Sequence, residues 1–228
     1  MAHRPIFIAG EMKGALYEEL SVQFQWHSGF SPSQKQKSMR ELHKEAKKVG
    51  LKNILEVSTK SERELGRRLS AFRLDVELSG VTSKIECVYQ ASKVFEKGGP
   101  FSELTFVKPI ESKRFFRDKK FGMITHFSFQ DIEYENLPFH AFYDWLFLRA
   151  LSSYAPYLEE KLSDIDGFSD IEFNPARSIN TQARSMAIIK TLIARNKIYE
   201  CAEDFDFFRE HLMIIEKKTS KQIRLNIA

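Results

Sequence analysis

Short stretches in which apolar and polar residues alternate are interleaved with helical stretches along the whole chain, and this interleaving most constrains the fold. Residues 72–78 alternate with period two before a Ser-Gly turn, which predicts a strand. Residues 138–153 and 176–195 instead predict strong helices. No internal repeat or long linker separates these segments. We therefore expect an α+β fold, a single domain over residues 1–228 that is rich in helices and has a few short strands.

Turn and cap signals place the remaining elements. Ser31-Pro32-Ser33 predicts the start of a helix that ends at Gly50. Ser83, with Glu86 three residues later, forms a capping-box pattern and predicts a helix over residues 83–96. Further helices are expected at residues 61–66, 109–119 and 203–214, and short strands at residues 6–8, 22–26, 54–57, 121–132 and 171–173.

Composition excludes several classes of protein. With 43% hydrophobic and 29% charged residues, the chain of 228 residues is neither disordered nor of low complexity. Twenty Phe, against 10 Gly and 7 Pro, can fill a sizeable core. No apolar run approaches the roughly 20 residues of a membrane helix, and the N-terminus has no signal-peptide pattern. Two cysteines make no disulfide framework, so we expect a cytoplasmic protein without a membrane partner.

Motifs for common cofactors are missing from the sequence. The six histidines are scattered without a His-x-x-x-His pair, which argues against a metal site. There is no Gly-x-x-x-x-Gly-Lys loop and no Gly-x-Gly-x-x-Gly fingerprint. We therefore expect no metal and no cofactor, and a P-loop enzyme or dinucleotide oxidoreductase is disfavoured.

The net charge of +4 is small, but two segments concentrate basic residues. One covers residues 34–52, and the other covers residues 108–120, where Phe115 and Phe116 lie among the cations. Such a run is either a solvated helix face or a nucleic-acid surface, because Lys and Arg bind phosphates and aromatic rings stack on bases.

The segment 83–95 carries the most informative pattern. On a helix Glu86, Gln90 and Lys93 lie at i, i+4 and i+7 and share one face. This face is either an exposed polar ladder or a catalytic surface. In the second case the carboxylate would handle a proton or water, the amide would orient a hydroxyl, and a desolvated lysine would act as a nucleophile.

Other polar residues have two interpretations each. Trp26 is either a half-buried aromatic at a strand end or a stacking surface for a ring. Asp144, between large aromatics, is either hydrogen-bonded in the core or faces a pocket. Asn180 and Arg184 share a helix face, which is either a solvated cap or a ligand contact, and Lys60 is either a loop lysine or a phosphate ligand.

Several blocks resemble the NADAR (YbiA-like) family, which acts on ADP-ribose or ribosylamine compounds. Glu86, Tyr89, Gln90 and Lys93-Val94-Phe95 resemble the Glu, aromatic, Gln and Lys-Phe helix of that family. The block at residues 54–66 resembles a second motif that normally follows this helix, whereas here it precedes it. The chain therefore resembles a circularly permuted branch. Further blocks, which extend the resemblance over residues 4–195, match antitoxins encoded beside DarT-type DNA ADP-ribosyltransferase toxins: residues 26–30, 34–38, 98–100, 142–146, 170–175 and 178–184.

The resemblance implies an antitoxin that removes ADP-ribose from guanine bases in DNA by N-glycosidic hydrolysis. Lys93 would be the nucleophile that forms a Schiff base, and Glu86 its acidic partner. ADP-ribosylated DNA would be the substrate, ADP-ribose the product, and the cognate toxin a further partner. Ligand-binding residues would be Gln90, Tyr89, Lys60, Trp26, Asp144, Asn180 and Arg184.

Two other functions remain open from the sequence. Ala71 and Leu65 stand where the family commonly has Asn and Trp, which favours a binding protein that neutralises the toxin without catalysis. An N-glycosidase for a small ribosylamine metabolite is the other alternative. Glu62 and Asp144 compete with Glu86 as the carboxylate that activates water.

Overall fold

The computed structural model describes residues 1–212 except 30, 118 and 177. Its first sheet contains four strands in the order β2-β1-β9-β3. β1 (Ala2–Ala9) and β2 (Tyr17–Phe24) pair antiparallel along their full length. β9 (Gly167–Ser169) lies next to β1 and runs parallel to β3 (Ile54–Glu56). This sheet therefore joins segments that are more than a hundred residues apart in the chain.

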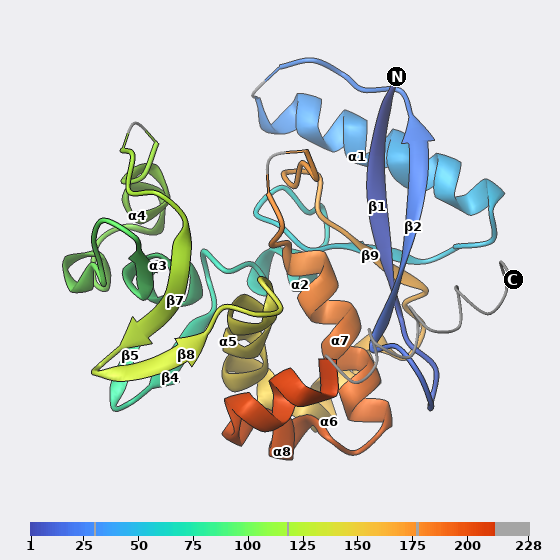
Figure 1. Cartoon of the computed structure of the whole chain (residues 1–228). Helices are drawn as coiled ribbons and strands as arrows, with labels where there is room; N and C mark the ends of the chain where they lie inside the picture. The colour runs from blue at the N-terminus through green and yellow to red at the C-terminus, as the bar shows by residue number, and fades with distance from the viewer. Residues whose placement is uncertain (30, 118, 177, 213–228) are drawn as a thin grey trace, which may run out of the picture.

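Helix α1 (Pro32–Lys48) packs on this sheet (Figure 1). The hydroxyl of Ser31 accepts a hydrogen bond from the Gln34 amide over 3.3 Å, and Pro32 occupies the first turn, where its missing N–H costs nothing. Gly50 follows the helix with a φ of 102°, which L residues rarely adopt. A small core fills the space between helix and sheet, formed by Ile6, Val22, Phe24, Met39, Leu42, Ala46, Ile54 and Ile171.

Helices α5 (Ala141–Leu151) and α7 (Gln182–Ala194) contact each other at the centre of the molecule (Figure 1). Both are buried on nearly every side, which fits sequences that are apolar at most positions around the helix. α6 (Ala155–Leu162) and α8 (Ile198–Glu203) pack against α7, and residues 205–212 are also helical. No described helix is both long and apolar enough to cross a membrane.

A second group of elements lies on the other side of α5 (Figure 1). β4 (Asp75–Leu78) and β5 (Val81–Lys84) form a hairpin. β6 (Lys93–Phe95), β7 (Ile124–Phe129) and β8 (Ile132–Glu135) form an antiparallel sheet. The helices here are α3 (Ile85–Ala91), α4 (Pro109–Arg114) and the short 3-10 helix at Ser102–Leu104. α2 (Glu64–Arg68) precedes the hairpin.

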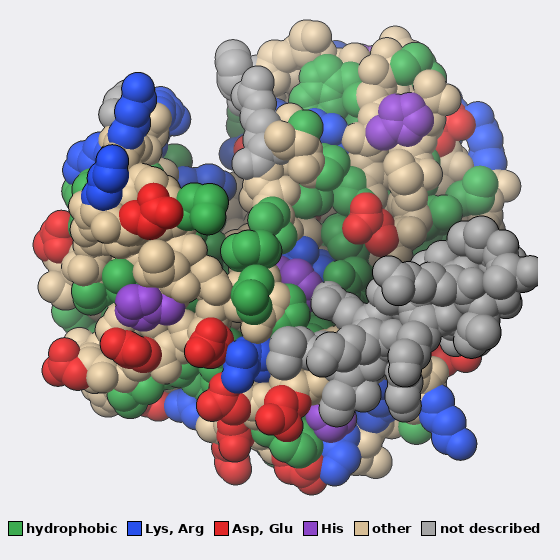
Figure 2. Space-filling model, viewed as in Figure 1, with side chains coloured by type: hydrophobic (Ala, Val, Ile, Leu, Met, Phe, Trp, Pro, Cys, Tyr) green, Lys and Arg blue, Asp and Glu red, His purple; other side chains and the backbone are tan. Residues whose placement is uncertain are grey.

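The surface is hollowed between the α4 side and the α1 side of the molecule (Figure 2). Lys and Arg side chains gather over α4, on one flank of this hollow. The α4 side comes from the middle of the chain, the α1 side joins the N-terminal strands with β9, and α5 and α7 connect the two sides below.

The α+β class is confirmed, and so is the helix that begins at Ser31. The expected helix over residues 83–96 is wrong at both ends, because α3 covers Ile85–Ala91 alone. The Ser83 hydroxyl donates to the Thr105 carbonyl over 2.5 Å and caps nothing. A second strand, β5, occupies Val81–Lys84 instead.

Several other helices and strands begin or end at residues that differ from those expected from the sequence. The strand expected at residues 171–173 is wrong, since β9 covers Gly167–Ser169 and the chain turns after it. The helices expected from residues 61 and 176 begin later, at Glu64 and Gln182. The helix expected over 109–119 ends at Arg114. In the last expected helix, residues 205–212 are helical, and 213–214 lie outside the described residues.

Candidate active site

A chain of three polar side chains begins on buried helix α3. Glu86 is 5% exposed and Gln90 is 7% exposed, so both need partners inside the protein. Gln90 Nε2 donates to Glu86 Oε1 over 2.9 Å, and Lys93 Nζ donates to Gln90 Oε1 over 2.7 Å. The amide of Gln90 therefore links the lysine to the carboxylate. The exposed-ladder interpretation of this segment is wrong, because two of its three members are buried.

Lys93 does not lie on the helix, contrary to the sequence prediction. It is the first residue of β6, where it pairs with Phe127 of β7, and Ser92 ends α3 just before it. The side chain nevertheless reaches back to Gln90, so the predicted grouping is correct although its helical cause is not. Its Nζ lies 4.6 Å from the centre of the Tyr89 ring and 5.1 Å from that of Phe116.

This environment changes the chemistry of the Lys93 amine. Burial lowers the pKa of Lys93 to about 8, Glu86 opposes this effect, and the positive charge of Lys113 adds to it. An exposed lysine has a pKa of about 10.4 and is almost wholly protonated at neutral pH. Lys93 therefore holds a much larger neutral fraction, and a neutral amine can attack carbon.

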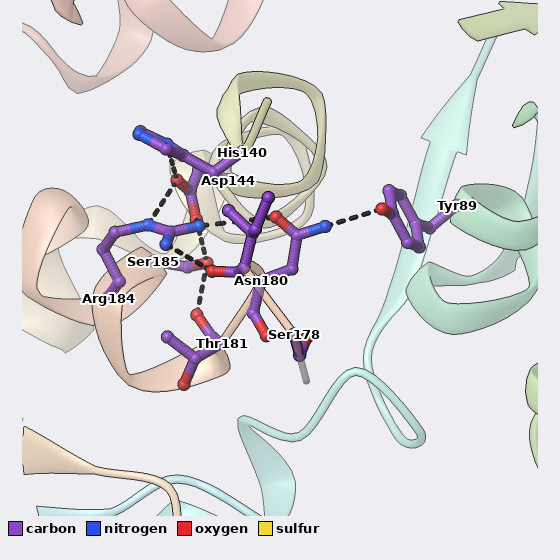
Figure 3. A network of polar contacts seen from close by, with 9 residues as sticks. Tyr89, His140, Asp144, Ser178, Asn180, Thr181, Arg184 and Ser185 are labelled. Carbon is purple, nitrogen blue, oxygen red and sulfur yellow. Dashed lines mark hydrogen bonds and ion pairs between the residues drawn. The ribbon is translucent and has the colours of Figure 1, made fainter. Parts of the chain in front are cut away.

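Tyr89 joins α3 to a second polar network on α5 and α7 (Figure 3). Asn180 Nδ2 donates to the Tyr89 hydroxyl over 2.6 Å, and Asn180 Oδ1 accepts from Arg184 at 3.5 Å. Arg184 is 4% exposed, and its Nε donates to Asp144 Oδ2 over 3.0 Å. The residues predicted from the first turn of α7 are thus brought to the same place as the α3 residues.

Asp144 is fully buried and has several partners besides Arg184. Ser185 donates to its Oδ1 over 2.5 Å, and His140 Nδ1 lies 2.8 Å from its Oδ2. Burial alone would raise the pKa of the Asp144 carboxyl, but Arg184 and the hydrogen bonds outweigh burial and leave the pKa below its usual value. Asp144 is therefore an ionised partner of Arg184, hydrogen-bonded within the core, and the structure gives its carboxylate no exposed surface.

A pocket of about 390 Å³ adjoins this network. Tyr89 and Asn180 form part of its wall, together with the aromatic rings of Phe127 and Phe139. A mostly apolar wall with a few polar groups is typical of sites that bind small molecules. Since Phe127 pairs with Lys93 across β6 and β7, the pocket and the lysine share one piece of sheet.

A third polar cluster surrounds two buried carboxyls on the sheet side, Glu56 and Asp170. Glu56 accepts from the Ser58 and Ser169 hydroxyls, each over 2.6 Å, and from the Ile171 amide over 2.9 Å. Burial and the nearby Asp170 raise the pKa of Glu56 well above its usual range. Burial likewise raises the pKa of Asp170. The pKa values of both carboxyls are therefore raised, whereas that of Asp144 is lowered.

Gln182 and Thr181 connect this cluster to α7. Thr181 Oγ1 donates to Asp170 Oδ2 over 3.2 Å, and Gln182 Oε1 accepts from the Ala71 amide over 2.8 Å. Because the Ala71 carbonyl accepts from the Glu86 amide over 3.1 Å, the chain entering α3 is fixed from both sides. The start of α7 thus positions Tyr89, Asp170 and the entry to α3 together.

Trp26 and Lys60 lie on the Glu56 side. Trp26 is half-buried, with Arg4 and Lys35 over its ring at 5.1 and 4.8 Å. Lys60 is half-buried in a loop where its amide donates to Ser58 Oγ over 3.1 Å. Both residues are held by contacts of their own rather than by the Lys93 network, and their ligand roles stay predictions. Glu62, a competing carboxylate, forms an exposed ion pair with Arg40.

The structure adds residues to the site that the sequence prediction did not select. Phe116 and Lys113 act directly on Lys93, and both lie in the basic segment 108–120. Glu56 could have been noticed as a carboxylate inside an apolar strand. Across the described residues, no group of three or more His, Cys, Asp or Glu side chains is placed to hold a metal ion.

Comparison with known proteins gives one finding about the whole chain. The sequence model of a family described as DarT1-associated NADAR antitoxin matches residues 2–222. No curated protein matches the chain.

Proposed function

This chain belongs to the family of DarT1-associated NADAR antitoxins, and on that premise we propose that it removes ADP-ribose from guanine in DNA by cleaving the N-glycosidic bond. The observation that carries the proposal is the tether Lys93–Gln90–Glu86. It combines an amine whose pKa is lowered to about 8 with a buried carboxylate one amide away. An exposed ladder of the same three residues would give neither property.

In the first step the lone pair of neutral Lys93 Nζ bonds to the anomeric carbon of the ribose. The bond from that carbon to the guanine nitrogen breaks, and its electron pair leaves with the base. The Glu86 carboxylate takes a proton from the attacking nitrogen and passes it to the departing guanine nitrogen, so it acts first as a general base and then as a general acid. The hydrogen bond to Gln90 holds the amine through an N–H, so the lone pair of a neutral Lys93 stays available.

The second step releases the sugar. The ring oxygen leaves the anomeric carbon with the bonding electron pair as the Lys93 nitrogen forms a protonated imine. Water adds to the imine carbon, and the Glu86 carboxylate passes a proton from that water to the ring oxygen. The proton of the new hydroxyl moves to the Lys93 nitrogen, and the carbon–nitrogen bond breaks to restore the amine. The product is ADP-ribose, whose aldehyde closes back to the ring. Positive charge develops on the sugar carbon in both steps, and a nearby carboxylate stabilises such charge.

The remaining predicted residues have supporting roles in this proposal. Tyr89 and Asn180 form the wall of the adjoining pocket, where a ring of the substrate would lie. Asp144 and Arg184 hold Asn180 in position from inside the core. Trp26 and Lys60, on the Glu56 side, would contact the adenine or pyrophosphate portion of ADP-ribose.

The test uses a DNA oligonucleotide that carries ADP-ribosylated guanine. Wild-type protein should release free ADP-ribose and leave unmodified DNA, as measured by mass spectrometry with no toxin present. Lys93→Ala should abolish release, and borohydride should trap an ADP-ribosyl adduct on wild type alone. Lys190→Gln is the matched control, because burial also lowers the pKa of Lys190, yet its amine bonds only to the Ser163 and Ile165 carbonyls.

Two outcomes would contradict the proposal. Release at the normal rate by Lys93→Ala would remove Lys93 from the mechanism. Absence of release by wild type, with protection of DNA only when toxin is present, would assign the protein to toxin binding.

A further inference from the structure

Residues 108–120 form a strongly basic surface segment. They contain six cations and two carboxylates, so this segment alone has a formal charge of +4, as large as that of the whole chain. The side chains of Lys108, Lys113, Arg114, Arg117, Lys119 and Lys120 are all exposed. Figure 2 shows Lys and Arg gathered here, on the flank of the hollow.

The basic helix α1 differs from this segment in its partners. Lys44 pairs with Glu41 and Lys48 with Glu45, so much of the charge on α1 is balanced on the same helix. Arg40 and Lys35 also have carboxylate partners, Glu62 and Glu172. Within the described part of the chain, none of the six cations of the segment 108–120 lies within 4.0 Å of a carboxylate.

Aromatic packing fixes this basic segment next to Lys93. Phe116 packs against Phe95 and Phe101, with ring centres 5.4 and 5.2 Å apart. The same Phe116 ring lies 5.1 Å from Lys93 Nζ. The exposed cations therefore stand on a packed support whose inner surface is a wall of the proposed active site.

We infer that the segment 108–120 binds the phosphate backbone of the DNA strand that carries the modified guanine. The inference rests on the proposed function, since it names the surface that would hold that substrate. Cations without carboxylate partners attract a phosphate polymer, and backbone contacts of this kind position the strand without reading its sequence. The strand passes the rim of the hollow, so its modified base reaches Lys93 while its phosphates meet Arg114, Arg117 and Lys120.

The experiment compares two substrates with the same scissile bond. One is a single-stranded oligonucleotide that carries ADP-ribosylated guanine. The other is ADP-ribosylated guanosine, which has the pyrophosphate but no DNA backbone. The α4 triple variant carries Arg114→Gln, Arg117→Gln and Lys120→Gln, at the end of α4 and just after it. It should lower kcat/KM for the oligonucleotide on the order of tenfold more than for the nucleoside. The salt dependence of oligonucleotide turnover should also become shallower, by about two units in the log–log slope.

The matched control is Lys44→Gln, Lys47→Gln, Lys48→Gln on α1, which removes the same charge from an equally exposed surface. It should leave the ratio between the two substrates at the wild-type value. An equal loss on both substrates in the α4 triple variant would overturn the inference and assign these cations to the pyrophosphate. An equal loss of oligonucleotide turnover in both triple variants would show that only the net charge of the protein matters. That result would also overturn the inference.

Failure of the proposed function would be recognised separately. If wild type releases ADP-ribose from neither substrate, binding of a fluorescent unmodified oligonucleotide still tests the surface. The α4 triple variant should then raise Kd on the order of tenfold while the α1 triple variant does not. Equal Kd values for wild type and both variants would contradict the inference without any appeal to catalysis.

Discussion

Arg184 and Lys93 are two cations held against the interior of the protein, and their partners differ. Arg184 donates to the buried carboxylate of Asp144, which it keeps ionised. Lys93 donates to the neutral amide of Gln90 and lies over two aromatic rings, while its nearest carboxylate partner is one side chain further away. The first arrangement keeps a fixed charge, and the second favours loss of a proton. The partner next to a buried cation thus decides whether its charge is stabilised or its pKa is lowered.

Removing the carboxylate of the first pair should have the largest effect. Asp144→Ala leaves Arg184 buried without its counter-charge and should lower the free energy of unfolding by about 3–5 kcal/mol. Lys93→Met removes an amine together with the cost of burying it, so it should lower that free energy by no more than about 1 kcal/mol. Urea unfolding of the two variants measures the difference. Equal losses in the free energy of unfolding would show that Arg184 and Lys93 contribute to stability in the same way.

Giving Lys93 a carboxylate partner, as Arg184 has, should turn Lys93 into a cation that keeps its proton. Gln90→Glu places a carboxylate beside the amine, which raises the pKa of Lys93 and keeps it protonated. We expect kcat/KM for release of ADP-ribose at neutral pH to fall on the order of tenfold or more, with partial recovery at high pH. Gln90→Met serves as the control, because it removes the tether without adding charge and should not move the pH profile upward. An unchanged pH profile in Gln90→Glu would show that the side chain at position 90 does not control the pKa of Lys93.

The wild-type pH profile should follow the neutral form of Lys93. With a pKa of about 8, the neutral fraction rises about tenfold between pH 7 and pH 9. We therefore expect kcat/KM to increase with pH and to level off above pH 8, until another group titrates. The dependence of borohydride trapping on pH should have the same midpoint. A flat profile over this range would mean that the amine is not the titrating nucleophile.

Among the residues that the structure describes, Glu56 has no cation paired with its carboxyl, in contrast to Asp144. Its folded-state pKa is raised, so the folded protein holds a proton that the unfolded chain has released above about pH 4.3. The contribution of Glu56 to stability is therefore full below that pH and is lost as pH rises toward the folded-state pKa. Glu56→Gln should remove this loss and gain stability relative to wild type between pH 5 and pH 7.5. Urea titrations at both pH values measure it, and an equal offset at both would contradict the prediction.

The smallest effect on stability is expected at Asn180, which links the Arg184 network to Tyr89 on α3. Asn180→Ala removes the donor to the Tyr89 hydroxyl and should lower the free energy of unfolding by about 1 kcal/mol. Ser178→Ala, two residues away on an exposed position, is the control for helix entry. Thermal unfolding of both variants distinguishes the link from a general effect on this loop.

The sequence predicts the fold class and the long helices because their signals are local. Ser31 with Pro32 specifies the start of α1, and the predominance of apolar residues indicates α5 and α7. The capping-box pattern at Ser83 failed, because its hydroxyl bonds a carbonyl 22 residues away. Local spacing cannot reveal such a partner.

The grouping of Glu86, Gln90 and Lys93 was predictable, and its geometry was not. The helix ends before Lys93, and pairing with Phe127 of β7 sets the position of the lysine. The roles of Phe116 and Lys113 also depend on packing between distant segments. Spacing along the chain therefore identifies which polar groups lie together, while the lowered pKa of Lys93 comes from neighbours that only the folded chain supplies.

The placement of Trp26 should make intrinsic tryptophan fluorescence sensitive to ligand binding on the sheet side. Of the two tryptophans, Trp145 is 3% exposed and donates to the Cys201 carbonyl, so solvent changes scarcely reach it. Trp26 is half-buried between two cations on the sheet side. A ligand that displaces Lys35 or covers the ring therefore alters the emission of a single indole, and intrinsic fluorescence can follow occupancy of that face without any label.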